Sequence, residues 1–244
     1  MIQRAKDAVL RAMVNTEAIM TEDVRQALIE DAMFTGMTSM SGIAIVHRPP
    51  SLRKETTRTI NNTLHQWKQY TDPHAQSTLG LRRSYGDADS SPSAPEEETE
   101  EQREEEKAFR SERVAFLLQN LNYLRKKQEP TFPLFSAHFF HSLIIDHLYI
   151  RTPTAGRLID HTAPHVALDN LFAFGAAAIA ASLRDYQEGV RSRREVTSAM
   201  WRADYHQVRE QIRQIRGDEG ESLRLDRLQR WMLARGRVEH NRSV

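Results

Sequence analysis

Histidine is the residue type in this 244-residue chain that is most suited to metal binding or catalysis. The chain has ten histidines and no cysteine. His138 and His141 lie one helical turn apart, so both imidazoles could face one metal ion. His161 and His165 could supply further ligands, although Pro164 makes helical geometry across that pair unreliable. The other candidate ligands nearby are Asp146, His147 and Asp160.

The spacing of these residues does not make them converge. Asp146 and His147 follow His141 by five and six residues, so on a helix they point away from the first histidine pair. The sequence leaves open whether the pair at 138 and 141 meets the pair at 161 and 165. We expect no bound metal, and a metal-dependent enzyme built on His138 and His141 is our second alternative.

The sequence lacks the motifs that identify common catalytic and nucleotide-binding sites. It contains no Gly-x-Ser-x-Gly elbow, no Gly-x-x-x-x-Gly-Lys phosphate loop and no Gly-x-Gly-x-x-Gly fingerprint. Nucleophilic catalysis by cysteine is excluded as well. We therefore assign no catalytic residue and no cofactor, and we favour a binding protein over an enzyme.

Arginine dominates the C-terminal quarter of the chain. All 13 basic residues after position 186 are Arg, and nine acidic residues lie among them. Arg prefers bidentate contacts with phosphate or carboxylate, so six residues are candidates for binding nucleic acid: Arg191, Arg193, Arg194, Arg209, Arg213 and Arg216. However, the sequence pI of 8.1 is below the value of about 9 that nucleic-acid-binding domains usually exceed. A nucleic-acid-associated accessory protein is therefore our first alternative.

Apolar residues near the C-terminus repeat with the spacing of one helical face, at Leu225, Leu228, Trp231 and Met232. Such a stripe should bind something apolar, because leaving these side chains in water is unfavourable. Gly217 and Gly220 precede it and could form a hinge. The stripe predicts a helix that docks onto a protein partner, a second copy of the chain, or its own domain.

The composition favours an intracellular protein. Charged residues make up 27% of the chain, and the longest uncharged apolar run, residues 170–183, is shorter than the roughly 20 residues that span a bilayer. The N-terminal residues carry charge where a secretory signal would be apolar. Without cysteine there is no disulfide to indicate secretion. We expect no membrane association, and the sequence does not distinguish nucleus from cytoplasm.

Helical periodicity predicts the fold class. Apolar residues recur every three or four positions, and the one strand-like run, residues 42–46, has no strand to pair with. We predict an all-α fold, an irregular bundle of about seven to eight helices. One helix should cover residues 134–150, and another should cover residues 168–188 and end at Gly189. The expected core comprises Leu117, Leu121, Phe139, Leu143, Ile144, Ile179 and Leu183.

Composition also divides the chain into segments. Residues 71–107 are rich in Ser, Pro and Glu, and we predict a disordered acidic insertion there because the segment repels itself and has little to bury. We expect N-terminal helices of the domain in residues 1–70 and its helical core in residues 108–217. Residues 218–244 should form an Arg-rich C-terminal helix and tail.

A series of motifs follows the start of the expected core. The first motifs are Val114-x-x-Leu117-Leu118, Asn122-Tyr123-Leu124, Phe132-Pro133-Leu134-Phe135 and Ile144-Ile145-Asp146-His147-Leu148-Tyr149. The next are Leu171-Phe172-Ala173-Phe174-Gly175-Ala176-Ala177-Ala178-Ile179 and Leu183-Arg184-Asp185-Tyr186-Gln187-Glu188-Gly189. This order resembles an uncharacterised helical domain of unknown function that is abundant in mushroom-forming (basidiomycete) fungi. The chain departs from the family pattern at Tyr186-Gln187, where the family usually has a Trp. The resemblance implies a helical fold and a fungal origin, and it implies no activity.

We interpret the chain as an intracellular helical domain that acts as a non-catalytic protein–protein interaction or regulatory module. Interaction predicts a discrete oligomer or a partner that is lost with the C-terminal helix. The first alternative predicts nucleic-acid affinity that falls steeply with salt. The second predicts a stoichiometric metal ion.

Overall fold

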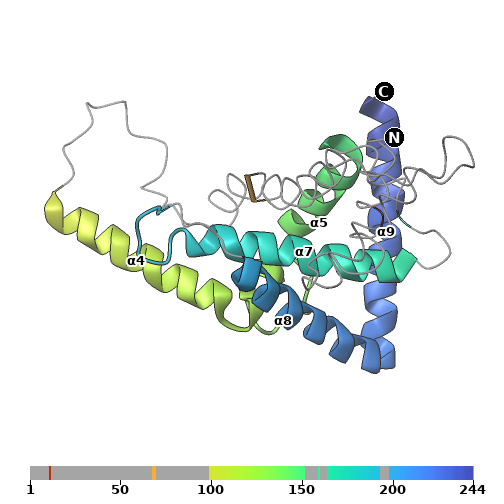
Figure 1. Ribbon diagram of the computed structural model, residues 1–244, viewed down its shortest axis with the longest axis horizontal. Helices are drawn as coiled ribbons and strands as arrows, with labels where there is room; N and C mark the ends of the chain where they lie inside the picture. The colour runs from red at the N-terminus through yellow and green to blue at the C-terminus, as the bar shows by residue number, and fades with distance from the viewer. Residues whose placement is uncertain are drawn as a thin grey trace, which may run out of the picture.

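The computed structural model describes residue 11 and residues 68–69, 99–151, 159, 164–192 and 198–243. The regular secondary structure of these residues is entirely helical, which confirms the predicted all-α class (Figure 1). The α-helices are α4 (Glu100–Leu118), α5 (His138–Ile145), α7 (Pro164–Arg184), α8 (Ser198–Gly217) and α9 (Glu219–Ser243). The 3-10 helices η1 (Gln119–Leu124) and η2 (Lys126–Gln128) follow α4, and the π-helix η3 (Asp146–Arg151) follows α5.

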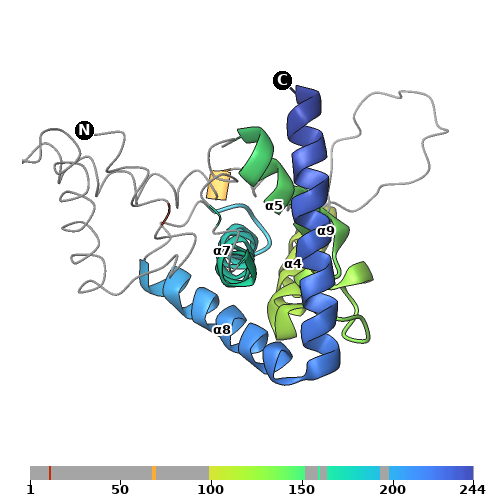
Figure 2. The ribbon, with the colours of Figure 1, turned by 90° about the vertical axis from the view of Figure 1, so that its right-hand side faces the viewer.

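Helix α7 lies at the centre of the bundle. Figure 2 looks along its axis and shows α5, α8, α9 and α4 arranged around it. Every residue from 167 to 183 is buried, because a helix that is apolar on all sides must be covered on all sides. Its run of alanines lets α8 approach closely. The helix ends at Arg184, earlier than predicted, and Gly189 lies in the turn beyond it with a φ of 74°.

Helix α4 begins inside the segment that we predicted to be disordered. Thr99 accepts a hydrogen bond from the Gln102 backbone, and the Gln102 side chain accepts one from the Thr99 backbone. This capping box, together with Glu100 and Glu101 in the first turn, favours helix formation. Residues 99–107 therefore differ from the prediction. Residues 71–98, like the strand-like run at 42–46, lie outside the described residues.

The connection from α4 to α5 extends to residue 137. The first residues of the helix predicted for residues 134–150 therefore belong to this connection and not to a helix. Five non-glycine residues here have positive φ, among them Leu121 at 57° and Phe135 at 62°. Positive φ is incompatible with a right-handed helix, so α5 starts only at His138. The connection is held by the hydroxyl of Tyr123, which donates to the Ala176 carbonyl at 3.1 Å.

Helices α8 and α9 form a V around the end of α7 (Figure 1). α9 packs against α5, η3, α7 and α8, and it continues without a break through Gly236. A Cβ atom at Gly236 would lie 2.2 Å from the Tyr149 ring, so this glycine permits the close contact with η3. All seven predicted core residues belong to the hydrophobic core or pack against it. Within the described residues, no helix has the length and apolar character needed to cross a membrane.

Candidate functional site

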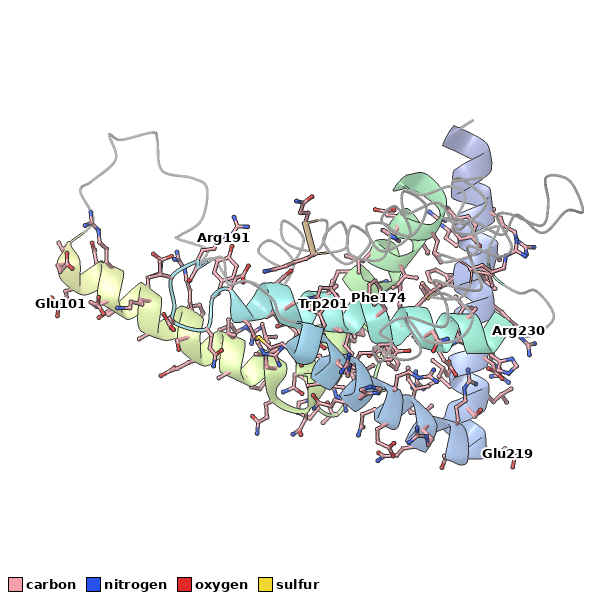
Figure 3. All side chains as sticks on the ribbon, in the orientation of Figure 1. Glu101, Phe174, Arg191, Trp201, Glu219 and Arg230 are labelled. Carbon is pink, nitrogen blue, oxygen red and sulfur yellow. The ribbon has the colours of Figure 1, made fainter. Side chains whose placement is uncertain are left out.

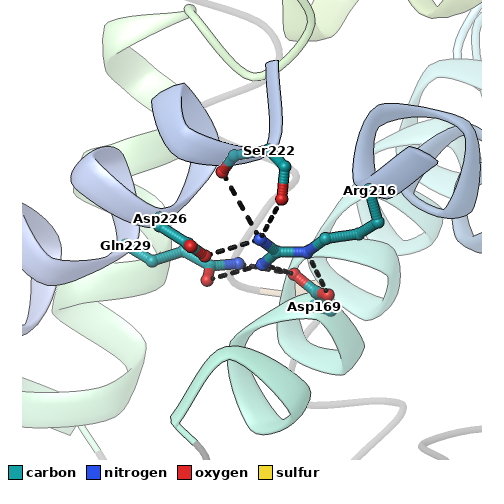
Figure 4. Close-up of polar contacts among 5 residues, drawn as sticks. All are labelled: Asp169, Arg216, Ser222, Asp226 and Gln229. Atoms are coloured by element: carbon teal, nitrogen blue, oxygen red, sulfur yellow. Dashed lines mark hydrogen bonds and ion pairs between the residues drawn. The ribbon is translucent and has the colours of Figure 1, made fainter. Parts of the chain in front are cut away.

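Three helices meet at Arg216, near the end of α8 (Figure 4). Its guanidinium binds both carboxylate oxygens of Asp169 in α7, through Nε at 3.0 Å and a terminal nitrogen at 2.9 Å. It also donates to Asp226 at 2.5 Å and to the Gln229 amide oxygen at 3.1 Å, both in α9. Gln229 in turn donates to Asp169 at 2.6 Å. We call Arg216, Asp169, Asp226 and Gln229 the Arg216 group. It fixes the start of α9 against α7 and α8.

The charge of Arg216 is compensated by the carboxylates of Asp169 and Asp226. Burial lowers the pKa of Arg216, but its hydrogen bonds with Asp169 and Asp226 outweigh burial, so the pKa is raised above its ordinary value. The arginine stays charged and its N–H groups are occupied. Because its partners are already present in the fold, Arg216 is not free to bind an external phosphate.

The inner face of α9 belongs to the core. Leu225 is fully buried and Met232 is 2% exposed, while Leu228 is partly buried against the same cluster. Of the four residues proposed to bind a partner, these three therefore contact the chain's own domain. Trp231 differs, because it is 48% exposed.

The opposite side of α9 forms a second, exposed apolar stripe. Leu223, Trp231 and Val238 are each between 46% and 48% exposed. With two other exposed residues, Arg227 and Ala234, they recur every three or four positions and so share one helical face. We call the stripe formed by Leu223, Arg227, Trp231, Ala234 and Val238 the outer face.

The ring of Trp231 packs against the ring of His141. The two rings meet edge to face with centroids 5.7 Å apart. His141 is buried and its Nε2 lies 2.7 Å from the Phe135 carbonyl oxygen. A carbonyl can only accept, so Nε2 carries the proton. The buried Nδ1 has no hydrogen-bond partner among the described residues, and burial lowers the pKa of His141.

The described residues bring together only two of the candidate histidine ligands. The rings of His138 and His141 lie 5.8 Å apart, but His141 uses one nitrogen for Phe135 and buries the other. His165 is exposed on α7, and His161 lies outside the described residues. In the part of the chain that the structure describes, no three His, Asp or Glu side chains are placed to hold one metal ion.

The six arginines proposed to bind nucleic acid do not form one described surface. Arg216 is turned inward to Asp169, and Arg213 pairs with Glu210 on the surface of α8. Arg209 is half-buried, and Arg191 is exposed in the loop after α7. Arg193 and Arg194 lie outside the described residues.

Charge is segregated along the molecule. Figure 3 labels Glu101 at the free end of α4 and Arg230 on α9 at the opposite end. Residues 100–106 carry five Glu and one Arg, and residues 100–105 are exposed. Helix α9, with the exposed Arg227 and Arg230, therefore lies away from the acidic end of α4.

Sequence reasoning missed Leu223 and Val238 as surface residues and Asp169 as a partner of Arg216. The signal for the first two was present, because positions 223, 227, 231, 234 and 238 follow helical spacing. For Asp169, the signal was an acidic residue at the start of an otherwise apolar helix. Which cation would pair with it depends on tertiary packing.

A family model described as a domain of unknown function, DUF6532, matches residues 4–215. The chain belongs to this family. Neither a curated protein nor a solved structure matches the chain. The DUF6532 match includes α4, α5, α7 and most of α8, and it ends before α9 begins. The helix that completes the Arg216 group and carries the outer face thus lies beyond the matched residues.

Proposed function

We propose that this DUF6532 chain is a non-catalytic protein–protein interaction module that binds its partner through the outer face of α9. The observation that carries the proposal is the exposure of Trp231 together with Leu223 and Val238 on a helix whose other face is already buried. Large apolar side chains that align on one exposed helical face are typical of interaction surfaces.

The charges around the outer face indicate the partner. Arg227 and Arg230 are exposed and form no ion pair with any described residue. They flank Trp231 along the helix, so a complementary surface would offer apolar side chains with carboxylates on either side. We infer that the partner is a protein presenting an acidic amphipathic helix, which would lie along α9 and pair its carboxylates with these arginines.

Trp231 is the expected anchor of the interface. Tryptophan and arginine are enriched among the residues whose truncation weakens protein interfaces most. The ring is held in place by His141 beneath it, so little side-chain freedom remains to be lost on binding. The same side chain is therefore both exposed and pre-positioned.

The test compares variants that change the outer face without touching the core. Proteins captured from cells by the full chain are identified, and each candidate is purified and titrated against wild type, Trp231→Ala and Arg227→Gln. We expect Trp231→Ala to weaken binding about thirtyfold, as loss of an interface anchor does. Arg227→Gln should weaken it less and reduce its salt dependence.

Val190 supplies the matched control, because it is 56% exposed but lies in the loop after α7. Val190→Ala should leave the affinity unchanged. Sedimentation equilibrium of the chain alone shows whether a second copy is the occupant. The proposal fails if every purified candidate binds Trp231→Ala as tightly as Val190→Ala. It also fails if Trp231→Ala weakens binding to anionic lipid vesicles but to no purified protein.

The two alternatives receive less support. Nucleic-acid binding would need Arg216 and Arg213, whose guanidinium groups already pair with carboxylates. A metal-dependent enzyme would need His141, whose nitrogens are bonded or buried. The resemblance to domains of mushroom-forming fungi supports a basidiomycete source, and the absence of cysteine supports an intracellular location. Microscopy of a tagged chain in such a fungus would test the location and distinguish nucleus from cytoplasm.

A further inference from the structure

Basic residues that form no ion pair with any described residue lie around the junction between α4 and the segment that leads to α5. Residues 113–128 include four basic residues and no acidic one. The four are Arg113, Arg125, Lys126 and Lys127, and none of them forms an ion pair with a described residue. By contrast, Arg110 in α4 pairs with Glu106, and Arg213 in α8 pairs with Glu210, each within one helical turn.

Backbone carbonyls bring two guanidinium groups to the same turn. Arg125 donates to the carbonyl of Phe132, and Arg224 from α9 donates to the carbonyl of Leu134 at 3.2 Å. Lys126 completes the group, with its Nζ 5.9 Å from the centre of the Phe132 ring. We call Arg125, Lys126 and Arg224 the basic turn cluster.

Carbonyl groups orient these cations but do not neutralise them. The pKa of Arg125 is lowered by burial and by the nearby charge of Arg224. Its buried Nε also lacks a hydrogen-bond partner among the described residues. Glu221 pairs with Arg224 at 2.8 Å, and it is the one described carboxylate that forms an ion pair with a residue of the cluster. Three cations and one carboxylate leave an excess of two positive charges.

We propose that the basic turn cluster binds a phosphate monoester group. A phosphate monoester carries a charge of about −1.5 to −2 near neutral pH, which matches the excess. Two guanidinium groups and an ammonium are the donors that phosphate oxygens prefer. A single carboxylate would leave one positive charge uncompensated. The cluster uses other side chains than the outer face of α9, so it stands whether or not the proposed function holds.

The proposal is tested by calorimetric titration of the full chain with two probes: inorganic phosphate and a peptide of neutral sequence containing one phosphoserine. We expect saturable binding of one phosphate group per chain. Lys126→Gln should weaken binding about tenfold, because a charge-assisted contact is lost. Arg125→Gln should do at least as much. Since Arg125 also holds the Phe132 carbonyl, the exposed Lys126 keeps the test valid if Arg125→Gln misfolds.

Arg213→Gln is the matched control, because Arg213 is an exposed arginine on α8 with a glutamate partner. It should change the affinity by less than about twofold. Trp231→Ala should also leave phosphate affinity unchanged, which separates this site from the outer face. Tighter binding of the phosphopeptide would identify a phosphorylated side chain as the source, and equal binding would identify free phosphate or a small phosphoryl compound.

Three results would overturn the proposal. The first is the absence of saturable binding of either probe. The second is binding that Lys126→Gln and Arg125→Gln both leave unchanged. The third is preferential binding of a single-stranded oligonucleotide that Arg213→Gln weakens as much as Lys126→Gln. This third result would indicate a diffuse field of basic residues that attracts nucleic acid.

Discussion

The described polar residues divide into those that the fold satisfies and those that it leaves available. Arg216 is surrounded by partners from α7 and α9, and Arg184 forms a two-point contact with buried Asp204 between α7 and α8. Arg125 and Lys126, by contrast, are placed by carbonyl and ring contacts alone. Residues of the first kind stabilise the fold. Residues of the second kind are those from which a bound ligand would gain the most interaction energy.

Replacing Arg216 should be costly. In Arg216→Met, buried Asp169 loses its ion pair and two hydrogen bonds. Removing one partner of a buried pair typically costs about 3–5 kcal/mol. Since the Arg216 side chain is 20% exposed, we expect a loss of about 2–4 kcal/mol in the free energy of unfolding. Urea unfolding measures this loss.

Arg213→Met is the control for that prediction. Its side chain is 74% exposed and pairs with Glu210 within the same helix. Surface pairs of this kind contribute little, so the expected change is within about 0.5 kcal/mol. Similar losses in the two variants would show that the Arg216 group does not stabilise the packing of the three helices.

His141 should make stability depend on pH. The pKa of His141 is lowered by burial, an effect that outweighs its hydrogen bond to Phe135. In the unfolded chain the imidazole takes up a proton below about pH 6.5, whereas in the folded chain it stays neutral until a lower pH. The unfolded state therefore binds more protons, and stability falls as pH decreases through that range.

His141→Gln keeps an N–H donor for the Phe135 carbonyl but does not titrate. Between pH 7.5 and 5.5, the wild type should lose up to about 1.4 kcal/mol more stability than this variant. Urea unfolding at the two pH values measures the difference. Parallel losses in the two proteins would mean that another group is responsible.

At the scale of elements, α9 has two faces that differ in their surroundings. Its inner face joins the core through Leu225 and Met232, and its outer face exposes Trp231. The sequence predicted one apolar stripe that included Trp231 with the buried residues. Helical periodicity locates a stripe to within a residue or two, but it does not say which side another helix covers. That depends on how η3 and α5 pack against α9, which no local pattern specifies.

The contact between α9 and η3 should not tolerate a side chain at Gly236. In Gly236→Ala the new Cβ would lie 2.2 Å from the buried ring of Tyr149, so one of the two elements must move. Overpacking of this kind costs about 1–3 kcal/mol, partly offset by the better helix propensity of Ala, about 1 kcal/mol. We expect a net loss of stability, measured by thermal unfolding.

Gly217 provides the comparison, because a Cβ there would meet nothing within 4 Å. Gly217→Ala should be neutral or slightly stabilising. If Gly236→Ala is equally well tolerated, α9 does not approach η3 as closely as the structure shows.

At the scale of the whole molecule, the sequence predicts most where side-chain type determines the outcome. The all-α class and the central burial of α7 follow from apolar content, because a helix without a polar side must be surrounded. The start of α4 at the capping box was missed, since the acidic composition around Glu100 outweighed the signal of Thr99 and Gln102. The basic turn cluster was missed for a different reason. Arg125 and Arg224 are far apart in sequence, and the segment that carries Arg125 contains positive φ values, as at Leu121 and Phe135, that no local pattern predicts.

The DUF6532 match ends at residue 215, but the structure indicates that the fold does not. Beyond that point, α9 contributes three buried side chains to the core: Leu225, Met232 and Leu233. Each should contribute about 1.5–3 kcal/mol, against a total stability of about 5–15 kcal/mol for a typical domain. A chain ending at Gly217 also leaves Arg216 without Asp226 and Gln229.

We therefore expect the chain ending at Gly217 to melt more than about 10 °C below the full chain, or to lose cooperative unfolding altogether. A chain ending at Val238 keeps every buried residue of α9 that the structure describes, so it should melt like the full chain. Adding a peptide of residues 218–244 to the shorter chain should restore part of the lost stability, because binding to the folded state raises the melting temperature. Scanning calorimetry of the three samples measures these effects. An unchanged melting temperature after truncation at Gly217 would show that α9 is an appendage, and its inner face would then be available to a partner as well.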